Sequence, residues 1–413
     1  MPTHDSAPSS GPLTGLRILE LGHFVAAPFG SRLLADLGAD VIKVEAPGGD
    51  PVRQWGRQVE GAGAPWTSMH QRNKRSLVLN LKDPRAVEVV LRLVRTCDAV
   101  IENFRPGQLA KMGLGREAME AARPGIVVAS ISGYGQDGLY RDRAAFGVIG
   151  EAIGGLRYLT NHPPSVSDLP PVRVGVSIGD SIAGLYAAFG IVAALWARDR
   201  KEGGDGRGRA IDVALTESVL SMMEGMLPEY GVFGSVRHPT GARIATASPS
   251  SAYPTADGKW ILIAGNSEPI FARLTALMGQ PELAQDPRFI GNGKRVANVE
   301  DLDRMIGAWS ATHSAADLER MLAEADVPST IAYTAAEIAA DPQFRARGMV
   351  QEVEDPQFGT VLHAGIVPHV PDDPGRIRWP GPRAGEHTDA ILRDVAGLDA
   401  DAIGKLREDG VAA

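Results

Sequence analysis

The chain has 413 residues, a formal net charge of −8 and 44% hydrophobic residues. This length predicts two domains, or one large and one small, because a single core seldom grows so large. The acidic balance argues against nucleic acid as the main partner. The single cysteine, Cys97, excludes an internal disulfide framework and is typical of a reducing compartment, so we expect a cytoplasmic protein.

The start of the chain and its apolar runs indicate neither secretion nor a membrane. Residues 1–11 are rich in Pro, Ser and Gly and predict a disordered tail, since they lack the basic start and apolar core of a signal peptide. The longest apolar candidate, residues 182–195, is too short and too rich in Ala and Gly for a bilayer span. We expect a soluble protein without a membrane partner.

Strand and helix patterns alternate through the first half of the chain. Short apolar runs predict strands at 16–21, 41–44, 99–101 and 126–131, and helices are predicted at 28–37 and 85–95. Strand–helix–strand units of this length join parallel strands. The pattern therefore predicts an open α/β sheet covered by helices.

The second half becomes mainly helical after a last strand at 210–214. A helix is predicted at 182–198, with small residues that would let it pack very closely: Ala183, Gly184, Ala187, Ala188 and Gly190. Residues 218–328 predict a smaller, mostly helical domain with one hairpin, 251–264, turning at Asp257-Gly258. From residue 342 the chain is rich in Pro and Gly, with a final helix near 398–409.

A glycine-rich segment, Gly133–Gly138, has the spacing of a dinucleotide-binding motif. That motif belongs after the first strand and opens a helix, whereas this segment follows a late strand and no clear helix begins at its end. We therefore favour a glycine-rich turn over a nicotinamide site. The histidines are scattered without metal-ligand spacing, so no metal site is predicted.

Two basic segments, residues 73–76 and 103–107, lie beside predicted tight turns. The second follows a strand, at the edge where open α/β sheets bind ligands. The cations that could surround a phosphate-bearing ligand are Arg72, Lys74, Arg75, Arg105 and Lys111. From the residues alone, solvated loop cations are an equal alternative.

The tripeptide Gly179-Asp180-Ser181 precedes the predicted apolar helix. Aspartate is a favourable N-cap residue, and the periodicity alone favours this capping role. Amides at a helix start also keep a carboxylate ionised, which makes it available as a nucleophile. The residues alone leave both interpretations open.

Taken in chain order, the motifs of this sequence resemble those of family III CoA-transferases over nearly the whole length. The matching segments are 15–21, 27–29, 37–45, Gly49-Asp50, Asn73–Ser76, Glu102–Gly107, Ser130–Gln136, Ile178–Asp180 and Gly385–Thr388. Several independent motifs in one order are far more specific than any single pattern.

The resemblance implies a doubly wound, Rossmann-like large domain and a smaller α+β domain in an interlocked homodimer. We expect residues 12–215 and the return segment 335–413 to form the large domain, and residues 216–334 the small one. An interlocked dimer would account for the extended, Pro-rich return segment.

The resemblance also implies an acyl-CoA:carboxylate CoA-transferase with Asp180 as its nucleophile. The carboxylate attacks the donor thioester and gives a mixed anhydride and free CoA thiolate. The thiolate attacks again to leave an aspartyl-CoA thioester, and the incoming acid reverses the sequence. The expected partners are an acyl-CoA and a free carboxylic acid, with no tightly bound cofactor.

By the same resemblance, the CoA contacts fall on segments that follow predicted strands. They are His23, Phe24, Ala26, Asn103, Phe104, Lys111 and Met112, with Asn73, Lys74 and Arg75 nearby. Arg105 is a further candidate from the charge pattern. Val25 stands where the formyl-CoA enzyme has a glutamine near the acyl group, so formyl and oxalyl substrates are not expected.

Two alternatives share this resemblance. The α-methylacyl-CoA racemases need a His–Asp pair, but Phe146 stands at the racemase histidine position and cannot move a proton. A non-catalytic CoA-binding protein would have no use for a nucleophile at Asp180.

The substrate prediction depends on residues 237–253, which resemble members acting on C4–C5 dicarboxylates such as succinate, malate, citramalate or itaconate. A second carboxylate needs a cation, and Arg243 is the candidate. A surface salt bridge is the alternative role for this arginine.

Overall fold

The computed structural model describes residues 11–413, which form two compact units. The first unit holds the described residues up to Arg157, together with Val174–Phe233 and Pro342–Ala413. The second holds Tyr158–Arg173 and Gly234–Asp341. Apart from Gly11, the predicted N-terminal tail lies outside the described residues.

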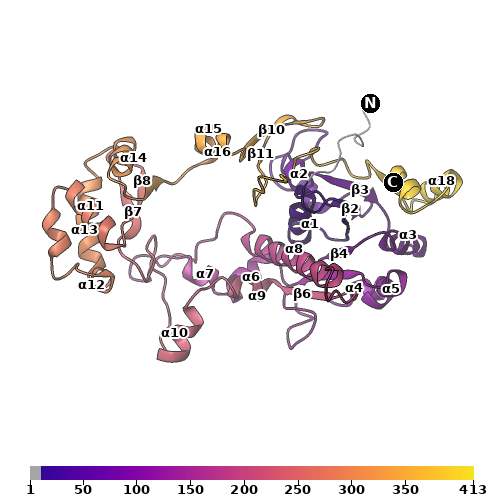
Figure 1. The fold of residues 1–413 in the computed structure, drawn as a ribbon, viewed down its shortest axis with the longest axis horizontal. Helices are drawn as coiled ribbons and strands as arrows, with labels where there is room; N and C mark the ends of the chain where they lie inside the picture. Colours follow the sequence, from indigo (N-terminus) through magenta and orange to yellow (C-terminus); the bar gives the residue numbers. More distant parts are fainter. Residues whose placement is uncertain (1–10) are drawn as a thin grey trace. The chain divides into compact units, whose positions relative to one another are not determined.

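A six-stranded parallel sheet forms the centre of the first unit (Figure 1). Its order is β3-β2-β1-β4-β5-β6. The strands are β1 (Arg17–Glu20), β2 (Asp40–Glu45), β3 (Lys74–Val78), β4 (Ala99–Glu102), β5 (Val127–Ser132) and β6 (Ala210–Ala214). The predicted α/β class with a parallel sheet is confirmed. The strand β3 was missed, because the charged segment at its start was interpreted as a turn.

Helices cover both faces of this sheet, which explains why its central strands β1, β4 and β5 read as continuous apolar runs. On one face, α1 (Ala26–Asp36) and α8 (Ile178–Asp199) pack over Ile18, Ile101 and Ala129. The other face is covered by α3 (Pro84–Val94), α5 (Arg116–Ala122), α17 (Thr388–Asp394) and α18 (Ala400–Glu408). Strand residues alternate between the two cores, as the pleat requires.

Helix α8 begins earlier than predicted. Its N-cap is Ser177, so Asp180 lies inside the first turn and the capping role for Asp180 is wrong. The small residues of α8 allow the close approach that was expected: a Cβ on Gly30 of α1 would lie 2.5 Å from the Gly184 carbonyl oxygen. Among the described residues, α8 alone has the length and apolar composition of a membrane span, features that core helices of soluble proteins share.

The C-terminal part of the first unit, Pro342–Ala413, makes hydrogen bonds to β3 and to the residue before it. It contains α16 (Pro342–Ala346) and a hairpin of β10 (Val350–Asp355) and β11 (Gly359–Ala364). The irregular chain that follows is tied to the start of β3, where the Asn73 amide donates to the Arg376 carbonyl at 2.8 Å and Trp379 Nε1 donates to the Lys74 carbonyl at 2.9 Å. The shorter helices of this unit are α2 (Trp66–His70), α4 (Gln108–Lys111), α6 (Gly147–Ile153), α9 (Leu215–Leu220) and α10 (Met226–Phe233).

The second unit has its own core around a three-stranded antiparallel sheet. Its strands are β7 (Ser250–Pro254), β8 (Trp260–Ala264) and β9 (Ser329–Ile331). Its helices are α11 (Glu268–Leu277), α12 (Asn292–Ala297), α13 (Val299–Ser310), α14 (Ala315–Glu324) and α15 (Ala335–Ala340). The predicted hairpin is present, and Gly258 in its turn has a φ of +75°.

Candidate active site

A cavity of about 780 Å³ opens at the carboxyl end of the parallel sheet. Its walls include the turn after β1 and the loop after β4. These two central strands continue in opposite directions across the sheet, and ligands of open α/β folds bind at such a switch point. The predicted ligand-binding edge is therefore the one that carries the cavity.

Asp180 borders this cavity from the first turn of α8. Its side chain is half-buried, and the start of a long helix favours a negative charge at this position. The carboxylate lies directly over Gly147, the first residue of α6, because a Cβ added there would overlap Oδ2 of Asp180. The backbone of α6 thus supports the carboxylate that faces the cavity.

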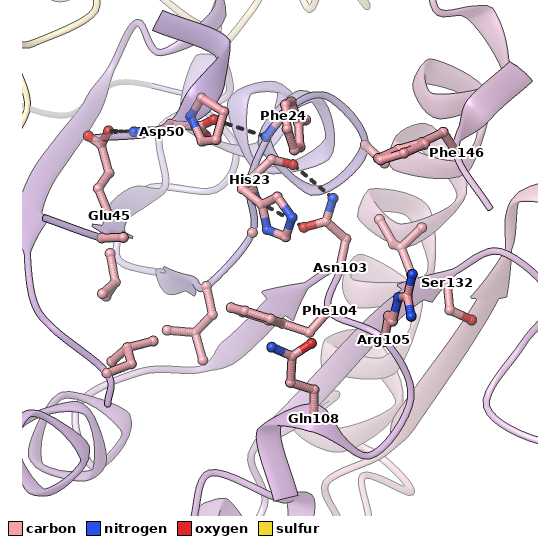
Figure 2. Close-up of a pocket in the computed structure, with 18 of the residues that line it drawn as sticks. His23, Phe24, Glu45, Asp50, Asn103, Phe104, Arg105, Gln108, Ser132 and Phe146 are labelled. Carbon is pink, nitrogen blue, oxygen red and sulfur yellow. Dashed lines mark hydrogen bonds between the residues drawn. The ribbon is translucent and has the colours of Figure 1, made fainter. Parts of the chain in front are cut away.

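The turn after β1 contributes two aromatic side chains, His23 and Phe24 (Figure 2). Phe24 has a left-handed backbone conformation, with a φ of +60°. Its ring meets the Phe146 ring edge-on at 6.2 Å, and the His23 ring meets Phe104 at 5.4 Å. Burial lowers the pKa of His23 below its ordinary value, so this imidazole is neutral at pH 7.

The loop after β4 supplies Asn103, Phe104 and Arg105 to the cavity wall. The Asn103 amide is engaged with the backbone of His23, accepting from its N–H at 2.9 Å and donating to its C=O at 2.8 Å. The Phe104 N–H donates to Glu102 at 2.7 Å, and burial raises the pKa of that carboxyl to about 7. Arg105 is exposed and pairs with no carboxylate among the described residues.

The cavity brings together most of the predicted site residues. Those that line it are His23, Phe24, Ala26, Asn103, Phe104, Arg105, Met112, Phe146 and Asp180. Val25 does not line it, because this residue is buried as the N-cap of α1. Lys111 lies exposed at the end of α4, outside the cavity wall.

The basic segment at the start of β3 is not brought to the cavity. Arg72 pairs with Asp36 at 2.7 Å, Lys74 with Glu20 at 2.8 Å, and Arg75 with Asp40 at 2.6 Å. The Asn73 amide donates to Asp36 at 2.9 Å and, as described above, anchors the return segment. These residues are held by carboxylates within the fold, so the structure gives them a scaffolding role where sequence analysis predicted CoA contacts.

Sequence analysis missed a second group of charges beside the cavity: Lys43, Glu45, Asp50, Lys82 and Arg143. Lys43 is fully buried and pairs with Glu20 at 2.6 Å and with Asp50 at 2.8 Å. A sequence signal for this group was present, because Lys43 and Glu45 stand within the apolar run of β2. Charges buried in a strand require charged or polar partners, so their presence indicates a buried ion cluster. The guanidinium of Arg143 lies 3.6 Å over the Tyr140 ring.

Arg243 belongs to the second unit, where its Nε donates to Asp303 at 2.6 Å. Asp303 also accepts from the Tyr253 hydroxyl at 2.7 Å. None of the described residues accepts a hydrogen bond from the two terminal nitrogens of Arg243. The arginine is therefore anchored through Nε, and the four N–H groups on its two terminal nitrogens make no hydrogen bond to the described residues.

Comparisons with known proteins agree on one family. The model of CoA-transferase family III matches residues 13–388. The chain is 45% identical over 397 residues to the succinyl-CoA–D-citramalate CoA-transferase of Chloroflexus aurantiacus, covering 96% of this chain and 97% of that one. It is 33% identical to the human succinyl-CoA:glutarate CoA-transferase, covering 97% and 90%. A crystal structure of a CAIB/BAIF family protein from Brucella suis superposes with a TM-score of 0.81 at 34% identity, covering 94% of this chain and 100% of that one.

Proposed function

Because this chain belongs to CoA-transferase family III and is a CoA-transferase, we propose that it moves CoA from succinyl-CoA to a C4–C5 dicarboxylic acid such as citramalate, malate or itaconate. The observation that supports this substrate class most is the 45% identity, over nearly both full lengths, to an enzyme named for succinyl-CoA and D-citramalate. Relatives named for L-malate and glutarate, at 36% and 35% identity, use acids of the same class.

The cavity supports a CoA thioester as the substrate. A volume of about 780 Å³ lies within the range of pockets that hold small molecules and cofactors. Apolar side chains such as Leu81 and Met112 suit the pantetheine and adenine parts, and Lys82 and Arg105 suit the phosphates.

The Asp180 carboxylate is the nucleophile in this proposal. It attacks the carbonyl carbon of the donor thioester, the C–S bond breaks, and CoA leaves as a thiolate beside a mixed anhydride. The thiolate then attacks the aspartyl carbonyl, releasing the donor acid and leaving CoA on Asp180. The acceptor carboxylate attacks this thioester, and the returning thiolate takes the acceptor acyl group from the second anhydride.

No step of this sequence requires a proton transfer, because carboxylates and thiolates exchange places as anions. Phe146, which lines the cavity together with Asp180, is a hydrocarbon and cannot take part in proton transfer, in keeping with this route. The aromatic side chains contribute by keeping water from the anhydride, which would hydrolyse.

Isotope transfer tests the nucleophile directly. When the acceptor is labelled with ¹⁸O in its carboxylate, its attack on the aspartyl thioester leaves one labelled oxygen on Asp180. We expect the peptide that contains Asp180 to gain this oxygen during turnover, and Asp180→Asn to abolish transfer without loss of CoA binding. Turnover without label in this peptide would refute the role of Asp180.

A panel of acyl-CoAs and free acids tests the substrate class. We expect succinyl-CoA and a C4–C5 dicarboxylate to exchange CoA faster than acetyl-CoA and acetate, with products read by mass spectrometry. Equal rates for monocarboxylates and dicarboxylates would refute the substrate proposal and leave the CoA-transferase activity standing.

A further inference from the structure

The turn between β1 and α1 is held by side chains from distant parts of the chain. The Gly22 carbonyl accepts a hydrogen bond from Lys43 Nζ at 2.9 Å, and the His23 N–H and C=O bond to the Asn103 amide at 2.9 and 2.8 Å. The Phe24 N–H donates to Asp50 Oδ1 at 3.0 Å, and the Phe24 carbonyl accepts from His70 Nε2 at 2.9 Å. A carbonyl only accepts, so the neutral His70 ring carries its proton on Nε2. The shape of the turn is thus set by residues outside it.

Phe24 needs this support because its φ of +60° is unfavourable for a residue with a side chain. Such conformations persist where the surroundings over-determine them, and they gather at functional sites. Here the conformation lets two consecutive residues, His23 and Phe24, both line the cavity. The Phe24 ring then packs against Trp55 at 5.2 Å as well as against Phe146.

Asp50 is the acceptor that fixes the N–H of this strained residue. Its Oδ1 accepts from Phe24 and, at 2.9 Å, from the Val52 N–H, and its Oδ2 pairs with Lys43 at 2.8 Å. The side chain is only 3% exposed. Although Asp50 borders the cavity, its Oδ1 accepts from two backbone N–H groups and its Oδ2 forms an ion pair with Lys43, so it acts on the turn rather than on a ligand. Figure 2 shows the bond from the Phe24 N–H to Asp50.

Asp50 is itself held in place by a buried ion cluster. Lys43 bridges Asp50 and Glu20, and Glu20 also pairs with Lys74 at 2.8 Å. Burial opposes ionisation of Asp50, but the charge of Lys43 outweighs it and lowers the Asp50 pKa to about 2. The carboxylate is therefore charged and fixed throughout the neutral range.

We propose that Asp50 is a positioning residue for CoA transfer: it keeps the His23–Phe24 turn in the conformation that presents both rings to the cavity containing the Asp180 carboxylate. The proposal rests on the CoA-transferase function set out above. Asp50 touches no reacting atom, and no bond to it is made or broken. Its effect is on the placement of the thioester, to which rates are highly sensitive.

The test compares Asp50→Ala, Asp50→Asn and a matched control, Asp83→Ala. Asp83 also accepts from a backbone N–H, that of Arg85 at the start of α3, but does not line the cavity. Two measurements are made on the full chain: kcat and KM for transfer from succinyl-CoA, and amide hydrogen exchange of the peptide spanning residues 22–27.

We expect Asp50→Ala to lower kcat about 100-fold while KM for succinyl-CoA changes less than about threefold, because most of the CoA-binding wall is unchanged. Exchange in the 22–27 peptide should rise. Asp50→Asn keeps an oxygen for the Phe24 N–H, so its kcat should be about tenfold higher than that of Asp50→Ala. Most of the protection of the 22–27 peptide against hydrogen exchange should also remain in Asp50→Asn. Asp83→Ala should change neither reading.

The outcomes separate this proposal from the proposed function. If the wild-type chain transfers CoA and Asp50→Ala keeps its kcat, the positioning role is wrong and the function stands. An equal loss of kcat in Asp83→Ala would also overturn it, as would faster exchange with kcat unchanged. If the wild-type chain transfers no CoA from any donor, the proposed function fails and the positioning role fails with it.

Discussion

The backbone of Gly147 lies so close to the Asp180 carboxylate that position 147 has no room for a side chain. A Cβ at this position would overlap Oδ2 of Asp180. We predict that Gly147→Ala pushes the carboxylate from its place and lowers kcat about 100-fold, because displacements near 1 Å cost about this much. Steady-state transfer measures the effect. Gly175→Ala is the control, since nothing lies within 4 Å of its added Cβ, and comparable losses in both variants would contradict the prediction.

Arg243 remains our predicted partner for the second carboxylate of the substrate. Asp303 fixes its Nε and leaves its terminal nitrogens to a ligand. We predict that Arg243→Gln costs a dicarboxylate roughly 2 to 4 kcal/mol in kcat/KM and a neutral acyl-CoA little. Arg288→Gln, which removes another paired arginine of the same unit, is the control. An equal loss for both substrates would indicate a structural role.

His70 makes the stability of the fold sensitive to acid. Burial lowers its pKa from 6.5 to about 3, so the folded chain takes up this proton only near pH 3 while the unfolded chain takes it up near 6.5. The contribution to stability is fully present above pH 6.5 and is lost as the pH falls toward 3. The loss at pH 5 is about 2 kcal/mol relative to pH 7, and burial of His363, whose pKa falls to about 4, acts in the same direction.

His70→Gln keeps an N–H for the Phe24 carbonyl and removes the titrating group. We therefore expect urea unfolding at pH 7 and pH 5 to differ by about 2 kcal/mol less in this variant than in the wild type. The exposed His369→Gln should behave as the wild type. An unchanged pH dependence in His70→Gln would show that the buried imidazole is not the cause.

At the scale of elements, the predictable parts were those whose pattern is local. The strands β1, β2, β4 and β5 read as apolar runs because helices cover both faces of the sheet. β3 did not, since it begins with Lys74 and Arg75, whose partners Glu20 and Asp40 lie far away in the sequence. A sequence gives the charges but not their pairing, and this is why buried ion pairs were interpreted as a phosphate site.

The candidate site was predictable in outline for a related reason. Its walls come from segments after strands, and the carboxyl ends of parallel strands meet at one edge. The resemblance to family III placed Asp180 and the two loops in one site, and the cavity contains them all. Sequence analysis missed the hydrogen bonds from Asp50 and His70 to the Phe24 backbone. They hold a left-handed conformation at Phe24 that no local sequence pattern predicts.

The contact between α1 and α8 is the closest helix packing that positions the site. A Cβ on Gly184 would overlap the Ala26 carbonyl oxygen and lie 3.0 Å from the Gly30 nitrogen, both backbone atoms that cannot move freely. We predict that Gly184→Ala lowers the free energy of unfolding by about 1 to 3 kcal/mol. Gly190→Ala on the same helix meets only the Ile211 side chain and should cost less. Denaturant unfolding of both variants measures the difference, and equal costs would contradict it.

At the scale of the whole molecule, helix α8 exposes an apolar stripe on the side that does not pack on the sheet. Leu185, Phe189, Val192 and Trp196 follow helical spacing and are all exposed, Phe189 by 69% and Trp196 by 68%. A continuous apolar stripe of this kind marks an interaction surface. The interlocked homodimer implied by the resemblance to family III would cover it with a second copy.

We predict that the chain is a dimer whose α8 stripe is buried against its partner. Two interlocked chains cannot separate without unfolding, so the mass measured by light scattering should stay at twice that of one chain even after dilution to nanomolar concentration. Phe189→Glu would place a charge in the interface at a cost of several kcal/mol, and this variant should yield monomer or aggregate in place of dimer. Leu139→Glu, at an exposed residue outside α8, is the control and should remain dimeric. A monomeric wild type would contradict the prediction, and a wild type that floats with lipid vesicles would assign the stripe of α8 to a membrane instead.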